Sequence, residues 1–224
     1  MDPQFEDIAR VALGACQEHG FVLAGGNALV AHRIGDRVTH DVDLFTNVGD
    51  PEAFHQAVIE AKDAFEARGD AVRVARSDPM FVRLYVSPSE QDGEVMVEFG
   101  YDYRQFPAVT LDVGPVLDPR DALASKLCAL YDRGEERDFI DVHRALEAGV
   151  VNSWAEAIGL ADQQSATPPP REYVRQGLKQ AETLDEGILR SYGLGKSEVE
   201  RLQESFADGV AAVDRGDLAG GPHL

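Results

Sequence analysis

The stretch from Phe21 to Phe45, FVLAGGNALVAHRIGDRVTHDVDLF, decides the fold of this chain. Its apolar start is typical of a strand, and the pair Gly25-Gly26 indicates a turn. Residues 27–31 favour a short helix, and residues 41–45 alternate as a second strand does. The stretch therefore predicts a strand, a glycine turn at a helix N-terminus, a loop, and a strand that carries two carboxylates.

The glycine turn predicts a phosphate site. Glycine lets the backbone approach a ligand closely, and the N–H groups of a first helical turn point outward with the positive end of the helix dipole. Gly25, Gly26 and Asn27 are therefore the candidate phosphate contacts. In the loop that follows, Arg33 or Arg37 is a candidate for a further nucleotide contact.

The two aspartates of the second strand predict a metal site. The strand period places Asp41 and Asp43 on one face. Two like charges ~5 Å apart at an effective dielectric of ~20 repel by roughly 3 kcal/mol, so stability alone does not explain the pair. A cation such as Mg²⁺ reverses this interaction and leaves coordination positions for substrate phosphate. Glu98, on an expected strand 94–99, is the candidate third ligand; the alternative is a solvent-facing residue of an edge strand.

Two blocks of the sequence carry a resemblance to a known family. Gly25-Gly26, followed after fourteen residues by Asp41-Val42-Asp43-Leu44-Phe45, resembles the signature of the DNA polymerase β-like nucleotidyltransferase superfamily. Residues 118–130, DPRDALASKLCAL, and then 137–141, RDFID, resemble the second block of its AbiEii/MenT-type toxins of bacterial toxin–antitoxin systems. The match covers roughly residues 20–146.

The resemblance implies an α+β fold. It would be a polymerase β-like nucleotidyltransferase core, with a mixed sheet flanked by helices, plus a C-terminal helical lobe. We expect the core at residues 1–116, the lobe at 117–213 and a disordered tail at 214–224. A capping box at residues 197–200 is expected to start the last helix.

The resemblance also implies a reaction, in which a nucleoside monophosphate passes from an NTP to an acceptor hydroxyl and pyrophosphate is released. Two magnesium ions, held by Asp41, Asp43 and Glu98, would assist it. Magnesium and an NTP are thus the implied cofactor and co-substrate. The implied acceptor is the 3′ end of tRNA, and the implied partner is a cognate antitoxin.

In the second block, the resemblance gives Lys126 a role in nucleotide binding and catalysis. The helix expected from Pro119 to about Tyr131 sets Lys126 beside small residues, which leaves its side chain room to extend. Asp141, in preference to Asp138, is the candidate catalytic carboxylate of the next helix, and the alternative is that both form intrahelical ion pairs.

The acidic net charge of the chain leaves alternatives to an RNA acceptor. The chain has 40 acidic and 21 basic side chains and a net charge of −19, so it repels nucleic acid except at a local basic patch. A cationic acceptor suits such a surface, so an aminoglycoside nucleotidyltransferase is the alternative enzyme. A glycosyltransferase and a catalytically inactive nucleotide-binding module are further alternatives. The candidate phosphate contacts are arginines 73, 76, 83, 133, 137 and 144.

The sequence also predicts where in the cell the protein is located. The N-terminus lacks the basic and apolar regions of a signal peptide, and no run approaches the ~20 apolar residues of a membrane span. Cys16 and Cys128 lack the spacing of a metal or disulfide motif and are expected in the core. We therefore expect a cytoplasmic protein that makes no contact with membranes.

Overall fold

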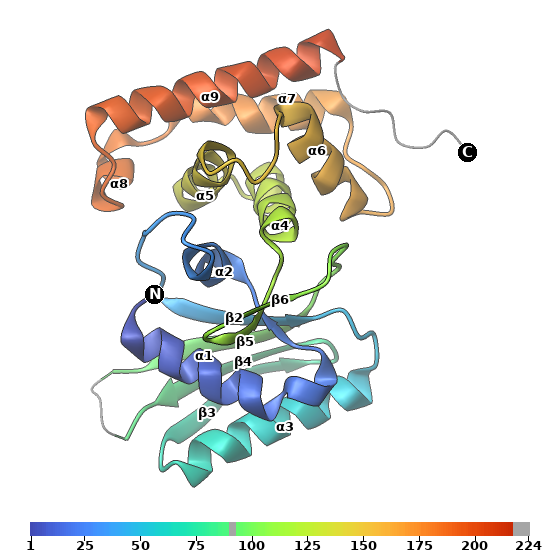
Figure 1. Ribbon diagram of the computed structural model, residues 1–224, viewed down its shortest axis with the longest axis vertical. Helices are drawn as coiled ribbons and strands as arrows, with labels where there is room; N and C mark the ends of the chain where they lie inside the picture. The colour runs from blue at the N-terminus through green and yellow to red at the C-terminus, as the bar shows by residue number, and fades with distance from the viewer. Residues whose placement is uncertain (90–92, 217–224) are drawn as a thin grey trace. The chain divides into compact units, whose positions relative to one another are not determined.

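The chain divides into two compact units, Met1–Asp118 and Pro119–Leu224. They are seen in a computed structural model that describes residues 1–89 and 93–216 (Figure 1). The expected boundary between residues 116 and 117 lies two residues before the observed one. Each unit has its own core and is described separately below.

The first unit is built on a mixed sheet of seven strands in the order β3-β4-β5-β2-β1-β7-β6. β2 and β5 are parallel, as are β1 and β7, whereas the remaining neighbours are antiparallel. The strands are β1 (Val22–Leu23), β2 (Asp41–Thr46), β3 (Ala71–Asp78), β4 (Phe81–Ser87), β5 (Val95–Tyr101), β6 (Val109–Leu111) and β7 (Gly114–Val116).

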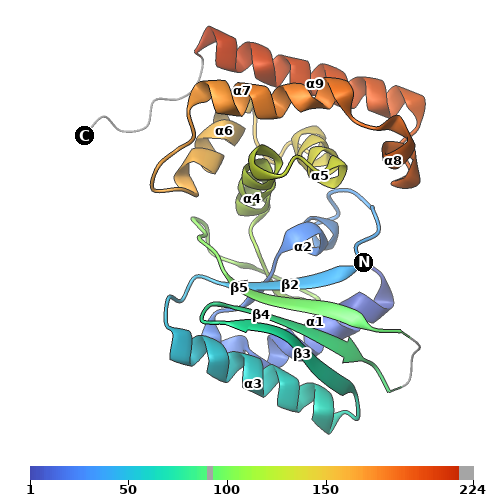
Figure 2. The same ribbon diagram turned by 180° about the vertical axis from the view of Figure 1, so that it is seen from behind.

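Two helices cover one face of this sheet. α1 (Pro3–Ala15) packs beside α3 (Pro51–Ala67), and together they bury the apolar side of β2 and its neighbours (Figures 1 and 2). Val42 and Leu44 on this side are fully buried. The short helix α2 (Gly25–Ala31) touches the opposite side of β2, where the aspartates lie. The strand period of β2 therefore separates its core-forming residues from its candidate chemistry.

The second unit consists of helices. α4 packs against α5, α6 and α7, and α7 runs along the long α9. At its centre the Phe206 ring contacts Phe139 and Trp154, with ring centroids 5.0 and 5.1 Å apart, and the Trp154 indole N–H donates to the carbonyl of Ser205. The helices are α4 (Pro119–Asp132), α5 (Glu136–Glu147), α6 (Trp154–Gln163), α7 (Arg171–Lys179), α8 (Glu186–Ser191) and α9 (Lys196–Arg215).

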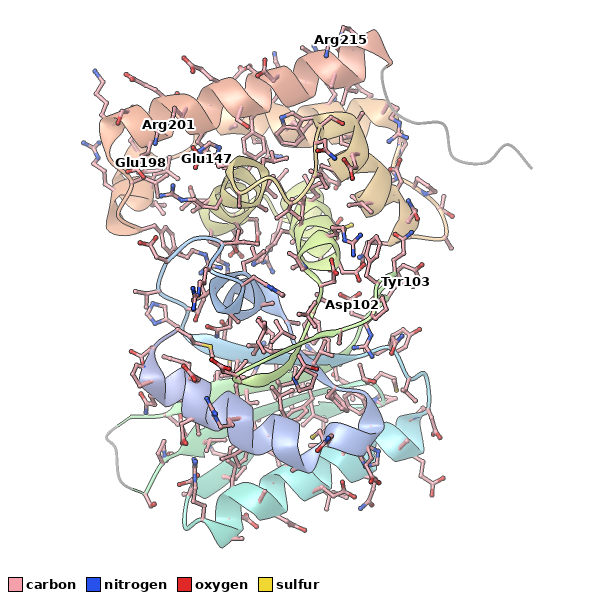
Figure 3. The ribbon with its side chains drawn as sticks, viewed as in Figure 1. Asp102, Tyr103, Glu147, Glu198, Arg201 and Arg215 are labelled. Carbon is pink, nitrogen blue, oxygen red and sulfur yellow. The ribbon has the colours of Figure 1, made fainter. Side chains whose placement is uncertain are left out.

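An ion-pair cluster at the start of α9 joins this helix to α5. Arg144 donates to Glu147 and Glu198, and Arg201 Nε lies 3.5 Å from a Glu147 oxygen (Figure 3). The second Glu198 oxygen accepts from the Gly195 N–H at 2.8 Å, and this bond is the main cause that lowers the pKa of Glu198. Helix α9 therefore begins at the N-cap Gly195 with the Glu198 carboxylate as its cap, and the prediction of a capping box at residues 197–200 was wrong.

The mixed sheet flanked by helices confirms the predicted α+β class. The β6–β7 hairpin has no counterpart in the prediction, because strands of three residues carry too little periodicity to recognise. α9 continues through Arg215, so the predicted tail begins too early, and its residues 217–224 lie outside the described part of the chain. Among the described residues, no helix has the length and apolar content needed to cross a bilayer.

Candidate functional site

The candidate site of the first unit is centred on β2. As predicted, Asp41 and Asp43 share one face of this strand, and both are half-buried, whereas Val42 and Leu44 between them are fully buried. The core side anchors the strand, and the two carboxylates are held at the opposite surface with little freedom of position.

Glu98 is brought to the same face by strand pairing. In the parallel pair β2–β5, Asp43 and Glu98 are direct partners, so their Cα atoms lie about 5 Å apart. β5 is an interior strand between β4 and β2, and the alternative of a solvent-facing residue on an edge strand is therefore wrong. Three candidate carboxylates thus occur on neighbouring positions of one sheet face.

Arg83 of β4 is a neighbour that the sequence analysis did not connect to Glu98. It is the cross-strand partner of Glu98, and its Nε donates to Glu98 Oε1 at 2.6 Å, with a second contact from Nη2. This pair directs the Glu98 carboxylate toward β4. Accordingly, within residues 1–89 and 93–216 no three acidic, histidine or cysteine side chains converge as a metal-binding cluster.

The glycine turn closes over Asp43. The Ala24 N–H donates to the carbonyl of Asp43 at 2.8 Å, and Gly25 follows with φ +58°, a conformation that favours glycine. A Cβ on Gly25 would lie 1.8 Å from Asp43 Oδ2, so the carboxylate occupies the space that any other residue would fill. The turn and the strand are therefore built around each other.

Arg37 lies against the second glycine. A Cβ on Gly26 would come within 2.4 Å of Arg37 Nη2, so the guanidinium sits directly on the turn. Arg37 comes from the 32–40 loop, and the sequence analysis named it only as the alternative to Arg33. Its charge and planar donors are suited to a phosphate oxygen at this place.

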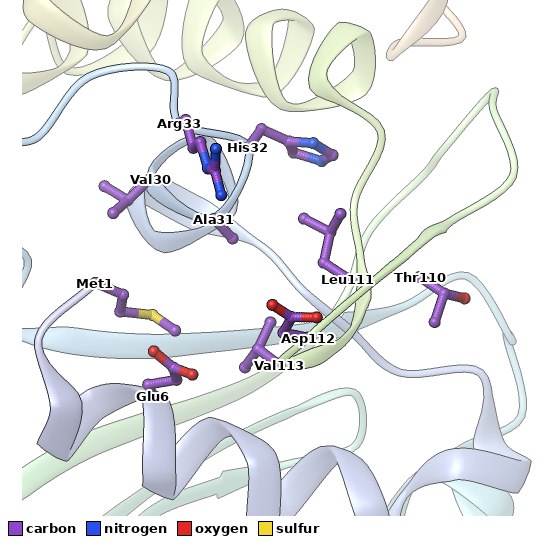
Figure 4. Close-up of a pocket in the computed structure, with 10 residues that line it drawn as sticks. All are labelled: Met1, Glu6, Val30, Ala31, His32, Arg33, Thr110, Leu111, Asp112 and Val113. Carbon is purple, nitrogen blue, oxygen red and sulfur yellow. The ribbon is translucent and has the colours of Figure 1, made fainter.

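Arg33 lies at the other end of α2. This helix of seven residues is about 10 Å long, and Arg33 follows its C-terminus with φ +61°. There Arg33 lines an open hollow of about 670 Å³ together with Glu6 and Asp112 (Figure 4). Arg37, and not Arg33, is thus the loop arginine at the glycine turn.

Asn27 has a different environment from the one expected. It is buried, its Nδ2 donates to the carbonyl of Asp41 at 2.6 Å, and its Oδ1 accepts from Thr39 Oγ1 at 2.6 Å. The side chain therefore fixes the start of β2, and the backbone N–H of Asn27 belongs to the first turn of α2. Nothing in the local sequence signals this role, because the partners are 12 and 14 residues away.

In the second unit, Lys126 forms a buried cluster with two aspartates. Its Nζ lies 2.8 Å from Asp141 Oδ2 and 3.6 Å from Asp138 Oδ1, and Lys126 is only 8% exposed. Arg133 makes two further bonds to Asp138, at 2.8 and 2.9 Å. The prediction that Lys126 has room to extend is wrong, because helix α5 supplies two carboxylates that hold its ammonium group.

The aspartates of this cluster join α5 to α4. Asp138 and Asp141 are buried, and their cationic partners Lys126 and Arg133 come from α4 and the residue just after it. The ion pairs of these two residues with Lys126 and Arg133 therefore connect α5 to α4 and its end, and are not confined to one helix. The two parts of the second sequence block, 118–130 and 137–141, are thus in direct contact through Lys126 and Asp141.

The donor set of the first unit fits a hard divalent cation. Asp41, Asp43 and Glu98 offer only carboxylate oxygens, which Mg²⁺ prefers, and the Asp43 carboxylate sits in the cradle left by Gly25. Rotation of the Glu98 side chain away from Arg83 would add a third carboxylate. The residues therefore suit a metal held mainly by the two aspartates.

Comparison with known proteins identifies the family and the fold of this chain. The family model described as "Nucleotidyl transferase AbiEii toxin, Type IV TA system" matches residues 15–210. A "putative nucleotidyltransferase from H. pylori" has a similar fold, with a TM-score of 0.61, 15% identity, and coverage of 96% of this chain and 98% of that one. JHP933 from Helicobacter pylori gives a TM-score of 0.59 at 15% identity, covering 97% and 96%.

A search of curated protein sequences finds no match. The family model, however, spans most of the chain and includes the β2 aspartates, the glycine turn and the Lys126 cluster. The chain is therefore a nucleotidyltransferase that belongs to the AbiEii toxin family of type IV toxin–antitoxin systems.

Proposed function

We propose that the chain transfers a nucleoside monophosphate from an NTP to the 3′ hydroxyl of an RNA, with the tRNA 3′ end as acceptor. The hydroxyl gives its proton to solvent as its oxygen attacks the α-phosphorus, the bond from this phosphorus to the bridging oxygen breaks, and pyrophosphate leaves. The observation that carries the proposal is the Asp43 carboxylate seated on the Gly25 turn, with Asp41 beside it and Glu98 in register.

Asp41, Asp43 and Glu98 are the residues that would hold divalent metal. Magnesium at these oxygens would neutralise charge on the triphosphate and lower the pKa of the attacking hydroxyl. Asn27 keeps the Asp41 backbone in place through its 2.6 Å bond, and the core side of β2 does the same for Asp43. These contacts fix the carboxylates before substrate arrives.

The phosphate contacts in this proposal are the backbone of Gly25, Gly26 and Asn27 and the guanidinium of Arg37. The missing Cβ atoms make room for the Asp43 carboxylate and the Arg37 guanidinium beside the turn, so a triphosphate bound there would meet the positive charge of Arg37. In the second unit, Lys126 is proposed as a nucleotide contact, with Asp141 as the carboxylate that orients it at 2.8 Å.

The proposed partner, beyond NTP and RNA, is a cognate antitoxin, as the family of type IV systems implies. The net charge of −19 favours a different acceptor, a cationic small molecule such as an aminoglycoside. These two acceptors are separated by the experiment that follows.

The test is transfer of label. The purified chain is incubated with MgCl₂, each of the four α-³²P-labelled NTPs and either total tRNA or an aminoglycoside; the RNA is run on a denaturing gel, and the aminoglycoside is separated by thin-layer chromatography. We expect one labelled RNA band that is lost with EDTA and in Asp41→Asn and Asp43→Asn variants. Asp63→Asn, on the exposed side of α3, is the matched control and keeps the label.

Label on an aminoglycoside and none on RNA would contradict the RNA acceptor and favour the alternative enzyme. Label on RNA that persists in both aspartate variants would contradict the proposed metal site, because chemistry would then not depend on β2.

A further inference from the structure

Arginines and aromatic rings gather on β3 and β4, on the sheet face that carries the aspartates. We define the arginine strip as Arg73, Arg76, Phe81, Arg83 and Tyr85. Arg83 pairs across strands with Glu98, and Glu98 pairs with Asp43, so side chains of the strip point to the same side as the candidate metal ligands. β3 is an outer strand of the sheet (Figure 2).

A bulge in β3 places its two arginines together. Arg73 and Arg76 are three residues apart, and a regular strand would point them to opposite faces. The register shifts between Val74 and Arg76, so that Arg73 lies opposite Tyr85 and Arg76 lies opposite Arg83. The inserted residue turns Arg76 onto the Arg73 side, which is a use of bulges common next to functional sites.

Each β3 arginine lies over an aromatic ring of β4. The guanidinium carbon of Arg73 is 4.4 Å from the centroid of the Tyr85 ring, and that of Arg76 is 4.9 Å from the centroid of the Phe81 ring. Their side chains nevertheless remain 58% and 61% exposed. The rings thus support two flat, charged groups that present a surface to solvent, and nucleobases stack on such guanidinium planes.

The arginines of the strip also have carboxylate partners. Arg73 bonds to Glu94 through Nη2 alone, Arg76 pairs with Asp78, and Arg83 pairs with Glu98. A guanidinium has five N–H donors, so these pairs leave donors for a phosphate. Exposed ion pairs contribute less than about 1 kcal/mol, so a phosphate can also replace the carboxylate. The three carboxylates balance the charge of the three arginines, so what the strip offers a nucleic acid is unused guanidinium donors and carboxylate partners that a phosphate can replace.

We propose that the arginine strip binds the single-stranded 3′ end of the acceptor RNA, with bases on the Arg73 and Arg76 planes and phosphates on their edges. The inference rests on the proposed function, because it assigns the acceptor side of that reaction. From β3 to β2 are three strand spacings, about 14 Å. The strip therefore receives the nucleotides that precede the reacting 3′ hydroxyl, and the hydroxyl itself lies at Asp43.

The test measures binding without turnover. A 5′-fluorescein-labelled, 12-nucleotide single-stranded RNA is titrated with the full chain and MgCl₂, without NTP, and anisotropy is recorded. We expect Arg73→Ala and Arg76→Ala each to weaken binding about ten-fold. Arg73→Lys and Arg76→Lys should recover only part of the lost affinity, because lysine keeps the charge but lacks the planar guanidinium on which a base stacks. Arg190→Ala, an exposed arginine paired with Glu186 on α8, is the matched control and leaves binding unchanged.

A second measurement detects stacking and separates this inference from the proposed function. An RNA with 2-aminopurine near its 3′ end should change its emission with the wild type and not with Arg76→Ala. In the transfer assay, the Arg73 and Arg76 variants should raise the KM for RNA about ten-fold and leave the KM for NTP unchanged.

The outcomes are distinct. If the wild type labels RNA but the strip variants behave as Arg190→Ala does, the inference is overturned while the proposed function stands, and the strip is left to another partner such as a protein. If the wild type does not bind the RNA, the inference is overturned. If RNA binding depends on the strip but no label is transferred to RNA, the strip stands as an RNA site and the proposed function fails.

Discussion

The two units use acidic residues in opposite ways. In the first unit, Asp41 and Asp43 are half-buried on one face of β2 beside a glycine turn. In the second unit, Asp138 and Asp141 are buried, with exposed fractions of 0% and 5%, and pair with Lys126 of α4 and with Arg133, the residue after this helix. Both pairs lie within the matched family region.

The difference follows from the electrostatics of burial. A buried carboxylate needs a cation and hydrogen bonds from its own chain, because water no longer compensates its charge. Half-buried carboxylates on one face retain access to a ligand that brings the compensating charge. We therefore assign the β2 pair to chemistry, Asp138 to structure, and Asp141 to the positioning of Lys126.

The largest expected effect on stability is at the buried cation. Lys126→Met should lower the free energy of unfolding by about 3–5 kcal/mol, because two buried carboxylates lose a partner. Arg190→Met, which removes an exposed pair with Glu186, should change it by less than about 1 kcal/mol. Urea unfolding at pH 7.5 measures both. Equal changes in the free energy of unfolding would show that the buried Lys126 cluster stabilises the protein no more than an exposed ion pair does.

A smaller loss of stability is expected from a substitution in the glycine turn. Gly25→Ala should lower the free energy of unfolding by about 2 kcal/mol, because φ is +58° and the new Cβ would displace the Asp43 carboxylate. Gly159→Ala in α6 meets no atom within 4 Å and should instead raise stability by about 0.5–1 kcal/mol. Thermal unfolding and the transfer assay check both, and a fully active Gly25→Ala protein would refute the close fit of turn and aspartate.

A pH effect smaller than these is expected at His143 in α5. Burial lowers the pKa of His143 below its ordinary value of 6.5, with Arg144 and Arg201 acting in the same direction and Glu147 and Glu198 opposing them. The unfolded chain then binds more protons than the folded one below about pH 6.5. Stability should be constant above about pH 7 and fall as the pH drops below 6.5.

His143→Met should reduce this acid-side loss, because methionine of similar size cannot take up the proton. Unfolding in urea at pH 7.5 and pH 5.5, with the wild type and the variant side by side, gives the difference. An identical loss in the two proteins would mean that other groups cause the pH dependence.

The smallest effect is expected at Arg33. The Arg33 N–H bonds to Val30 and the Ile34 N–H to Leu29, so Arg33 holds the left-handed position that ends α2. Arg33→Gly should relieve this strain and raise stability by about 0.5 kcal/mol. Since Arg33 lies at the far end of α2 from the glycine turn, the KM for NTP should stay unchanged, whereas Arg37→Ala should raise it. A raised KM for NTP in Arg33→Gly would contradict this placement and indicate that Arg33 contacts the nucleotide.

Much of the first unit could be predicted because its signals are local. The alternation of β2 and the Gly25-Gly26 turn lie within one stretch of sequence, and the structure reproduces both. The Arg83–Glu98 pair and the position of Arg37 could not be predicted, because they depend on strand register and on the path of a loop.

The burial of Lys126 shows the same limit. Its small helical neighbours predicted an extended side chain, but the two carboxylates that hold it come from α5, more than ten residues along the chain. The sequence pattern of α4 shows which side of the helix is apolar. It does not show which side chains of α5 will contact Lys126. Where the sequence-based prediction was wrong, the environment of the residue is therefore set by tertiary contacts.

The most direct test compares Asp43→Asn with Asp138→Asn in two assays, label transfer per folded molecule and urea unfolding. The account predicts that Asp43→Asn loses at least about a thousand-fold of transfer and keeps its stability within about 0.5 kcal/mol. It predicts that Asp138→Asn loses about 3 kcal/mol of stability and keeps its transfer rate. An Asp43→Asn protein that is unstable but fully active once folded would contradict the assignment of the β2 pair to chemistry.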